Sequence, residues 1–459
     1  MIRPLYLTLF LFLFFYDAFG QLPSAIVQPS DSIRYTAGGV GAVSRNLAFK
    51  LDDYKSVKDY GAVGDGIHDD GAALQAAFNT QQNILLPPGT YRVTTQLRLK
   101  RGSYMISGYN ATIEYSGNQD ALVLENGFRG ALEGFTLKGK NAHGHGLFVS
   151  DEVRSYHLKG IHVEQFSDST KAGIYLSGGY SGTISNQCII QNNYYGIYKP
   201  GASQAGQYLI SDNYINNNKV GISLETAGIF TIFRNNIECN RLGMNLEGVG
   251  GNVTYLINVL YNNFEGNLLY PQPTALLVKN TFNVVVQGNA FRHEGTPASA
   301  YTAARFISGN QEATFAGNYI AGTTCYIDSV AIGNSQVNTS GNIIGSGSIV
   351  DKRTFNGDGI DINRSQQIKG IRSVLFQKDV NNYQYELKTS LSAAGLSVQY
   401  GGGEKALITN KGGMTVKDGE GEFETTGGGK GLIVKTPDGT KRYRISVSNS
   451  GTLTTTLVP

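Results

Sequence analysis

The chain has 459 residues, of which 41% are hydrophobic and only 16% charged, and its net charge is +3. The low content of charged residues argues against intrinsic disorder. Positive and negative charges are nearly equal in number, which gives no indication of nucleic-acid binding. Glycine is abundant at 59 residues, but proline is scarce at 11 and glycine has no three-residue period, which excludes a collagen-like chain.

The first 20 residues have the pattern of a secretory signal. Arg3 precedes a mostly apolar run over residues 5–16, which is too short to span a bilayer of about 30 Å. Small residues before Gln21 suit a cleavage site. We therefore expect residues 1–20 to be removed and the mature protein to be secreted without a membrane span. A buried strand and a membrane anchor are the alternatives.

A linker is expected over residues 21–52, and a short helix over residues 72–78, directly after Asp69 and Asp70. The apolar stripe of this helix is Leu74, Ala77 and Phe78, at the spacing i, i+3, i+4. An aspartate can cap the start of such a helix. Apolar residues 84–86 predict the first strand beneath it, so the helix would cover an edge that could otherwise pair with other chains.

The middle of the chain repeats with steps of 22–29 residues. One column reads Phe135, Ile161, Cys188, Asn213, Asn235, Asn262, Asn289, Asn318 and Asn342. A second column is the glycine that opens a short strand, at Gly146, Gly173, Gly196, Gly221 and Gly243. The leucine framework of leucine-rich repeats is missing, whereas short β-branched and aromatic runs predict several strands per coil.

Stacked coils would place equivalent residues about 4.8 Å apart. The asparagine column would then form a ladder of buried amides, each hydrogen-bonded to its neighbours. The alternative is that asparagine only marks surface turns. The three cysteines, Cys188, Cys239 and Cys325, are expected to be small core residues.

Two stretches carry a family resemblance: SVKDYGAVGDGIHDDGAALQAAF (56–78) and ILLPPGTY (84–91). They resemble the opening of the pectate-lyase-like superfamily, which includes rhamnogalacturonase, epimerase-like and phage tailspike members. The resemblance implies an all-β, right-handed, single-stranded parallel β-helix over residues 53–350 with a short N-terminal capping helix. Gly71 is a departure, since the family usually has threonine there. Residues 35–51 are similar to the linker before the β-helix of phage tail proteins.

Residues 351–459 differ from the repeats in being glycine-rich, with short alternating strands such as residues 432–435, and we expect a glycine-rich β-strand tail. Residues 431–457 resemble C-terminal strands of phage tail fibres. Such a segment has little core of its own, and oligomerisation is one way to bury it. We therefore expect an oligomerisation or attachment module and a homotrimer. A flexible secretion or attachment tail is the alternative.

The strand opened by each column glycine indicates a candidate site. Strand alternation directs offsets +2 and +4 outward, which places Phe148, Tyr175 and Tyr198 on one face, followed by Glu225 and Glu247. Aromatic rings can stack on sugar faces. Two carboxylates one rung apart repel, which can raise the pKa of one of them and leave an acid beside a base.

These residues predict a polysaccharide site with Glu225 and Glu247 as catalytic groups. Four residues are expected to bind the substrate, namely Tyr175, Tyr198, Lys199 and Arg241. Lys199 occupies an inward offset, but we expect its side chain to leave the interior because it ends a strand. A carboxylate separation near 5 Å would suit a retaining glycosidase, and it would equally suit a shared Ca²⁺ ion. No other cofactor and no dedicated metal site are indicated.

A rival set of candidates is Glu238, Glu265 and Arg292, for which a surface ion pair between Glu265 and Arg292 is the simpler interpretation. Asp212 near Arg234 has the same interpretation. The sequence His143-Gly-His145-Gly resembles the Gly-His-Gly of polygalacturonases, but the two Asp-containing motifs of that family are missing. Asp65, Asp69 and Asp70 are explained by a turn and a helix cap.

Three functions fit this sequence. The first is a secreted polysaccharide-active enzyme, either a glycoside hydrolase or a polysaccharide lyase. The second is a non-catalytic glycan-binding adhesin, and the third is a phage tailspike-like receptor-binding protein. The signal segment favours an exported protein over a virion part. The expected partner is a polysaccharide, and no nucleic-acid partner is expected.

Overall fold

The computed structural model describes part of the chain. In its first part the described residues are 32–178, 181–201, 206–267, 274–293, 302–307, 309–327 and 341–351. In its second part they are 373–378, 383–389, 395–400, 403–409, 414–416, 432–435, 440–447 and 450–458. The predicted signal segment lies outside these residues. The chain divides into two compact units between residues 367 and 368.

Where a linker was predicted, residues 32–52 form a small exposed unit. Strand β1 (Arg34–Tyr35) pairs antiparallel with β2 (Arg45–Asn46). Helix α2 (Leu47–Leu51) follows at once, because the Asn46 side chain accepts a hydrogen bond from the Ala48 amide at 2.8 Å and caps the helix start.

The capping helix is confirmed as α3 (Gly71–Phe78), preceded by the 3₁₀ helix η1 (Val57–Tyr60). Its predicted apolar stripe is buried. Of the two aspartates predicted to cap it, Asp69 accepts from the amide of Gly71, the first residue of the helix, at 3.0 Å, whereas Asp70 makes no cap bond. The Asp70 carboxylate accepts instead from the amides of Val63 and Gly64, at 2.6 and 3.0 Å, so it closes the preceding turn.

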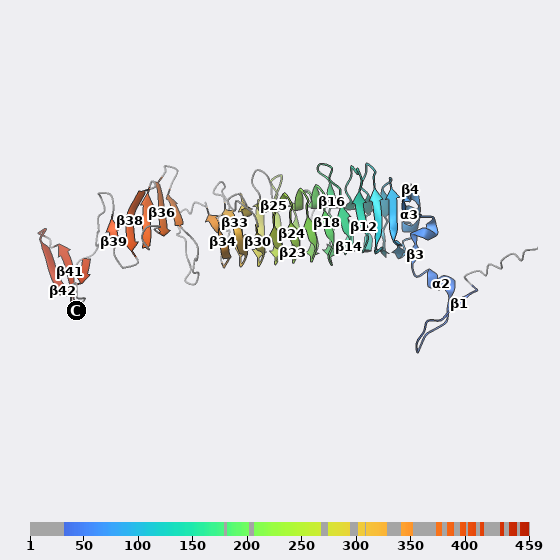
Figure 1. Ribbon diagram of the computed structural model, residues 1–459, viewed down its shortest axis with the longest axis horizontal. Helices are drawn as coiled ribbons and strands as arrows, with labels where there is room; N and C mark the ends of the chain where they lie inside the picture. Colours follow the sequence, from blue (N-terminus) through green and yellow to red (C-terminus); the bar gives the residue numbers. More distant parts are fainter. Residues whose placement is uncertain are drawn as a thin grey trace, which may run out of the picture. The chain divides into compact units, whose positions relative to one another are not determined.

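Beyond α3 the first unit is a parallel β-helix, as predicted, with three strands in each full coil (Figure 1). The first face is one sheet: β3 (Lys55–Ser56), β5 (Ile84–Leu85), β8 (Gly102–Ser107), β11 (Phe128–Glu133), β14 (Arg154–Lys159), β17 (Ser181–Ser185), β20 (Gln207–Ser211), β23 (Gly228–Phe233), β26 (Thr254–Leu260), β29 (Thr281–Gln287) and β32 (Thr314–Ala316). Each strand pairs in parallel with its equivalent one coil away.

The second and third faces are two further rows of parallel strands. The second face holds β4 (Asp65–Asp69), β6 (Gly89–Val93), β9 (Ala111–Tyr115), β12 (Thr136–Gly139), β15 (His162–Glu164), β18 (Ile189–Gln191), β21 (Tyr214–Asn216), β24 (Asn236–Glu238), β27 (Asn263–Glu265) and β30 (Ala290–Arg292). The third face holds β7 (Leu97–Leu99), β10 (Leu122–Leu124), β13 (Leu147–Val149), β16 (Ala172–Leu176), β19 (Tyr195–Lys199), β22 (Val220–Glu225), β25 (Leu242–Glu247), β28 (Thr274–Lys279) and β31 (Thr302–Phe306). Strands β33 (Tyr319–Ile327) and β34 (Ile343–Asp351) continue both rows.

The asparagine ladder is confirmed at the turn from the first to the second face. The Asn235 amide donates to Asn262 Oδ1 at 3.0 Å and to the Ile210 carbonyl at 2.8 Å, and its own Oδ1 accepts from the Asn213 amide at 3.0 Å. The ladder continues in the same way to Asn342. The asparagines from Asn213 to Asn318 are therefore buried with their hydrogen bonds made, and Asn342 ends the ladder half-buried, so the column does more than mark surface turns.

The residue before each ladder position has a left-handed backbone, which explains the sequence there. Gly288, Gly317 and Gly341 adopt this conformation readily, with φ between 62° and 67°. Asp212 and Arg234 adopt it at 58° and 53°, and they form a surface ion pair at 2.7 Å as predicted. This tight turn aims the next side chain into the interior.

A second ladder lies at the turn from the second to the third face. It is formed by Asn193, Asn218, Asn240 and Asn267, which are all at most 2% exposed. Neighbouring side-chain amides are bonded at 3.0–3.1 Å. The sequence aligns Asn218 with Asn240, but the second ladder was not predicted.

The cysteine prediction is correct for one residue and wrong for another. Cys188 is buried in the ladder column, where its amide donates to Asn213 Oδ1 at 3.2 Å. Cys239 is exposed, because it sits in a left-handed turn position with φ of 54°. The side chain of Cys325 lies outside the described residues.

The described residues of the second unit form two antiparallel sheets. One antiparallel sheet holds β35 (Ser373–Lys378), β36 (Tyr383–Thr389), β37 (Gly395–Tyr400), β38 (Gly403–Thr409) and β39 (Met414–Val416). A second holds β40 (Leu432–Lys435), β41 (Arg442–Val447) and β42 (Leu453–Val458). None of the helices in the described residues has the length and apolar character needed to cross a membrane.

Candidate functional site

The glycine column sets the geometry of the third face. A Cβ atom built on Gly221 would lie 2.5 Å from the carbonyl oxygen of Gly243, and one on Gly196 would lie 2.4 Å from that of Gly221. Glycine therefore lets adjacent strands approach at this point. The following residues stay in register as predicted, with Tyr175 opposite Tyr198 and Glu225 opposite Glu247.

The predicted aromatic residues form a continuous strip, but much of their ring surface is already covered. Phe148 stacks on Tyr175 with ring centroids 5.0 Å apart and planes 12° from parallel. Tyr198 meets Tyr175 edge-on at 5.7 Å and stacks on Tyr195 at 4.3 Å. Since the rings stack on one another, the strip offers ring edges and hydroxyl groups more than free faces.

His145 extends this strip and was not predicted to belong to it. Its ring lies 4.2 Å from that of Tyr175, and its Nδ1 accepts a hydrogen bond from the Ala172 amide at 2.9 Å. Burial, assisted by the charge of Lys171, lowers the pKa of His145 to about 4. The imidazole is therefore neutral near pH 7 and acts as a hydrogen-bond acceptor within the fold.

The strip ends on a carboxylate. The Tyr198 hydroxyl donates to Glu225 Oε2 at 3.0 Å. Burial and the negative charge of Glu225 raise the pKa of Tyr198 above its usual value, so its phenol keeps its proton. Tyr198 thus holds the Glu225 carboxylate in place from the neighbouring strand.

Glu247 has a different partner, Lys279. In the register of β25 and β28 the two residues are opposite each other, and Lys279 Nζ lies 2.6 Å from Glu247 Oε1. The row along the third face is therefore Glu225, Glu247, Lys279. The sequence analysis missed Lys279 because the glycine column ends at Gly243 and Ala275 takes its place in the next coil.

The predicted outward orientation of Lys199 is wrong. Its side chain is fully buried, and it lies opposite Leu224 among the inward residues. Its ammonium donates to the Pro200 carbonyl at 2.8 Å. Burial lowers the pKa of Lys199 to about 8, and the charges of Asp151 and Glu225 oppose that shift. Lys199 therefore lies in the interior, where its charge interacts with those of Asp151 and Glu225.

Arg241 is exposed, but it is not beside the carboxylates. It precedes β25, whereas Glu247 ends that strand, so the two backbones are about 20 Å apart. Its amide donates to the Asn218 carbonyl at 3.0 Å, in the turn of the second ladder. Arg241 therefore borders the third face on the far side from Glu225 and Glu247.

The rival set lies on the second face, on neighbouring strands. Glu238 accepts from the Asn236 amide at 2.8 Å and from the Tyr214 hydroxyl, and Glu265 accepts from the Asn263 amide at 3.2 Å. Arg292 is opposite Glu265 in register, and its guanidinium lies over the Tyr319 ring at 5.8 Å. The predicted ion pair between Glu265 and Arg292 is not formed among the described residues, because Glu265 is bonded to Asn263 and Arg292 lies over Tyr319.

The carboxylates of Asp65 and Asp69 are held by nearby groups. Asp65 accepts from the amides of Ile67 and His68, and Asp69 accepts from the Gly71 amide and the Thr94 hydroxyl. In the described part of the chain, no group of three or more histidine, cysteine, aspartate or glutamate side chains is placed to hold a metal ion. A Ca²⁺ ion at Glu225 and Glu247 would also compete with Lys279.

Comparison with known proteins identifies the family. Residues 54–127 match the family described as rhamnogalacturonase A/epimerase, pectate lyase-like. Residues 101–282 and 155–320 match the right-handed β-helix region. The chain belongs to the pectate-lyase-like superfamily of right-handed β-helices. The predicted superfamily and fold class are thereby confirmed.

Two curated proteins share a short segment with this superfamily member. The plasmin and fibronectin-binding protein A of Streptococcus pneumoniae is 44% identical over 68 residues, which are 14% of this chain and 10% of that protein. The mannuronan C5-epimerase AlgE6 of Azotobacter vinelandii is 49% identical over 47 residues, 9% of this chain and 5% of that protein. The chain thus spans a tenth or less of the length of these relatives.

Solved structures of similar fold come from varied sources. ORF18 of Geobacillus virus E2 is 13% identical, with 94% of both chains covered and a TM-score of 0.46. The A-module of the Azotobacter vinelandii epimerase AlgE4 is 17% identical over 66% of this chain and 98% of that chain, with a TM-score of 0.47. A tailspike of E. coli bacteriophage HK620, in complex with a pentasaccharide, is 12% identical over 69% and 71%, with a TM-score of 0.46.

Proposed function

We propose that this protein acts on a polysaccharide, which lies along the third face parallel to the helix axis. The observation that carries this proposal is the unbroken series of contacts from His145 through Tyr175 and Tyr198 to Glu225. Hydroxyl and carboxylate groups repeat there at the spacing of the strands, which suits a repeating chain of sugar hydroxyls. The names of the similar proteins, among them a mannuronan epimerase and a pentasaccharide-bound tailspike, agree with a glycan ligand.

Glu225 and Glu247 are the proposed reacting groups. They are opposite each other on neighbouring strands, whose backbones are about 4.8 Å apart. That backbone spacing allows the carboxyl groups to approach to the distance of about 5 Å that retaining glycosidases use. Glu247, paired with Lys279, would supply the carboxylate that attacks. For this step Glu225 would have to carry a proton on Oε1 and pass it to the leaving oxygen, while the Tyr198 hydroxyl, bonded to Oε2, would hold the side chain in place.

The second candidate function is glycan binding without cleavage, as in an adhesin or a tailspike-like receptor-binding protein. One observation favours it: both carboxylates already have partners, Tyr198 for Glu225 and Lys279 for Glu247. In this role the same row would bind sugar hydroxyls through hydrogen bonds alone. The protein would be secreted or displayed on the cell surface in either case.

A panel of polysaccharides tests the proposal. We would incubate the full protein with each glycan and measure reducing ends and absorbance near 235 nm. Reducing ends without absorbance identify a hydrolase, and both signals identify a lyase. Binding with neither signal identifies the second candidate function. The proposal would be contradicted if the protein neither cleaved nor bound any glycan of the panel.

Variants then test the site. Glu225→Gln and Glu247→Gln should each lower turnover by about 10²-fold or more, because each removes one of two proton-transfer or nucleophilic roles. Glu114→Gln is a matched control, since Glu114 lies on the second face and pairs with Lys140. If both site variants keep full activity, the site is wrong, and Glu238→Gln tests the rival set.

A further inference from the structure

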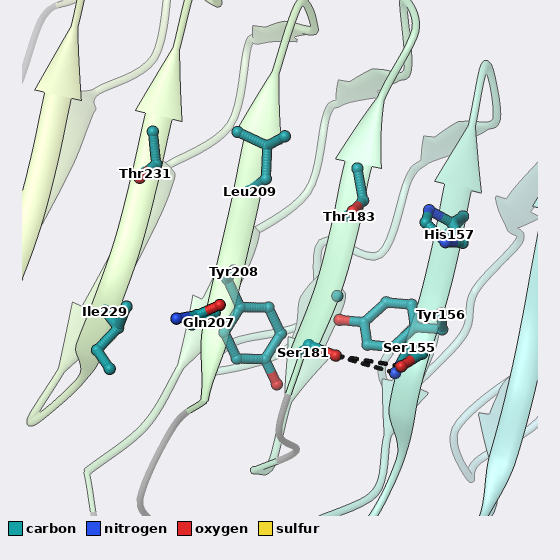
Figure 2. Close-up of a pocket in the computed structure, with 11 residues that line it drawn as sticks. Ser155, Tyr156, His157, Ser181, Thr183, Gln207, Tyr208, Leu209, Ile229 and Thr231 are labelled. Atoms are coloured by element: carbon teal, nitrogen blue, oxygen red, sulfur yellow. Dashed lines mark hydrogen bonds between the residues drawn. The ribbon is translucent and has the colours of Figure 1, made fainter.

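The first face carries two hollows that no part of the proposed third-face site uses. The hollow shown in Figure 2 has a volume of about 520 Å³ and lies over β14, β17, β20 and β23. The other, of about 490 Å³, lies over the starts of β8, β11 and β14. Arg154 lines one and Ser155 lines the other, so the two hollows adjoin at the start of β14.

Together they form a groove along the helix axis, which we call the first-face groove. It spans the six strands from β8 to β23, or about 24 Å at the spacing of parallel strands. Figure 2 shows His157, Thr183, Leu209 and Thr231 projecting from successive strands of its wider part. Because the groove runs along the helix axis across successive strands, an extended glycan chain could lie in it.

One end of the groove is strongly basic. Arg101, Arg129 and Arg154 line it, with Glu152 as the single carboxylate among its lining residues. All three arginines are exposed, and among the described residues neither Arg101 nor Arg129 has an ion-pair partner. Guanidinium groups keep their charge at any ordinary pH, so this end repels cations and attracts anions.

The backbone is shaped to place Arg101 there. Gly127 has φ of +84°, which glycine adopts without strain. The stem of Arg101 lies against it, because a Cβ atom on Gly127 would be 2.9 Å from Arg101 Cγ. Any larger residue at position 127 would displace this arginine. The basic end is therefore held by the local fold as well as by composition.

The rest of the groove is neutral, with a polar rim and an apolar end. The Ser155 amide donates to the Ser181 hydroxyl at 3.1 Å (Figure 2). Beneath this rim the Tyr156 hydroxyl is buried and has no hydrogen-bond partner within the described residues. Ile229, which is 38% exposed, is forced outward by a left-handed backbone with φ of 53°, a rare conformation for a β-branched residue. The equivalent residues of the next two coils, Leu256 and Asn283, have the same conformation, so the repeat geometry places Ile229 on this surface.

We propose that the first-face groove binds a second stretch of glycan that carries carboxylate groups, that is, a uronate chain. Arginine forks bind carboxylates in a two-point geometry, which fits the basic end. Serine, threonine and glutamine at the rim fit sugar hydroxyls, and Leu209 and Ile229 fit the apolar sides of sugar rings. This groove lies on another face from Glu225 and Glu247, so the inference does not depend on the proposed reaction.

The absence of tryptophan from the chain gives a direct test. Leu209→Trp places a single fluorophore in the groove, and Leu277→Trp places one on the third face beside Asn245. The probe is an oligogalacturonate, and its fully methyl-esterified form is the uncharged control. We expect the tryptophan emission of Leu209→Trp to change saturably as oligogalacturonate is added, and to change much less with the methyl-esterified form.

Charge variants complete the experiment. Arg101→Gln with Arg129→Gln, made in the Leu209→Trp protein, should weaken binding on the order of 10-fold or more, because each arginine loses a charged hydrogen bond. Lys138→Gln with Lys140→Gln removes the same charge from the second face and should leave binding within about 2-fold.

Four results would overturn the inference. The first is no change in the emission of Leu209→Trp when oligogalacturonate is added, whether or not the emission of Leu277→Trp changes. The second is equal response to the esterified chain. The third is an equal loss of oligogalacturonate binding when Lys138 and Lys140 are replaced on the second face. The fourth is equally tight binding of single-stranded DNA, which would indicate a surface that binds any polyanion. If only Leu277→Trp responds, the third-face proposal stands while this one fails.

Discussion

The Tyr198 hydroxyl donates a 3.0 Å hydrogen bond to the Glu225 carboxylate across two neighbouring strands of the third face. This contact joins the aromatic strip to the carboxylate row. It also fixes the position of Glu225 through a residue whose ring is stacked on Tyr195. The candidate site is therefore organised before any ligand arrives.

Removing this hydroxyl should affect function more than stability. In Tyr198→Phe the ring contacts remain and only the hydrogen bond is lost, so we expect the free energy of unfolding to fall by about 1 kcal/mol or less. Glycan binding or turnover should fall by about 10-fold, because Glu225 is no longer held. Tyr195→Phe is the control. Equal function in Tyr198→Phe and the wild type, measured on the same glycan, would show that this contact is only structural.

Replacing one ladder asparagine should destabilise the β-helix. Asn235→Ala leaves groups on Asn213, Asn262 and the Ile210 carbonyl without a partner, which should cost about 1–3 kcal/mol. Asn258→Ala is the control, since Asn258 lies on the outer side of the first face. Urea unfolding measures both. Similar values for the two variants would contradict a special role of the ladder.

Lys199 should make stability depend on pH in the alkaline range. Its pKa falls from 10.5 to about 8 in the fold, so between these values the unfolded chain binds more protons than the folded chain. Stability from this group therefore rises as the pH goes from about 8 to about 10.5. Lys199→Met should stabilise the protein at pH 7 by about 1–3 kcal/mol, with less advantage at pH 10.5. Unfolding curves at both pH values check this, and a destabilised variant at pH 7 would show that its bonds outweigh the cost of burial.

The second unit is expected to support a homotrimer. Residues 431–457 resemble fibre strands, and the structure places them in the antiparallel sheet of β40, β41 and β42. The outer strand, β42, carries exposed Leu453 and Leu457. Light scattering on the full protein should give three chain masses. A single chain mass at micromolar concentration would rule the trimer out.

Local patterns predicted the fold well because each coil repeats the same turn chemistry. Asn213 through Asn342 and the glycines up to Gly243 determine which residues stack, and the motif at residues 56–78 indicates the superfamily. The orientation of Lys199 was mispredicted because strand alternation kept the side chain inside despite its charge. Lys279 was missed because its coil lacks the column glycine. The first-face groove depends on side chains from six strands, which no single repeat reveals.

Each coil touches only the coil before it and the coil after it, as β20, β23 and β26 do. The stability of such a stack is a sum over neighbouring coils, so the stack opens from its ends inward. Tyr198 lies on β19, with four described strands of the third face before it and six after it, counting the continuations in β33 and β34. The aromatic strip therefore lies inside the stack, and loss of the terminal coils would shorten the protein before it disturbed the residues that meet the ligand.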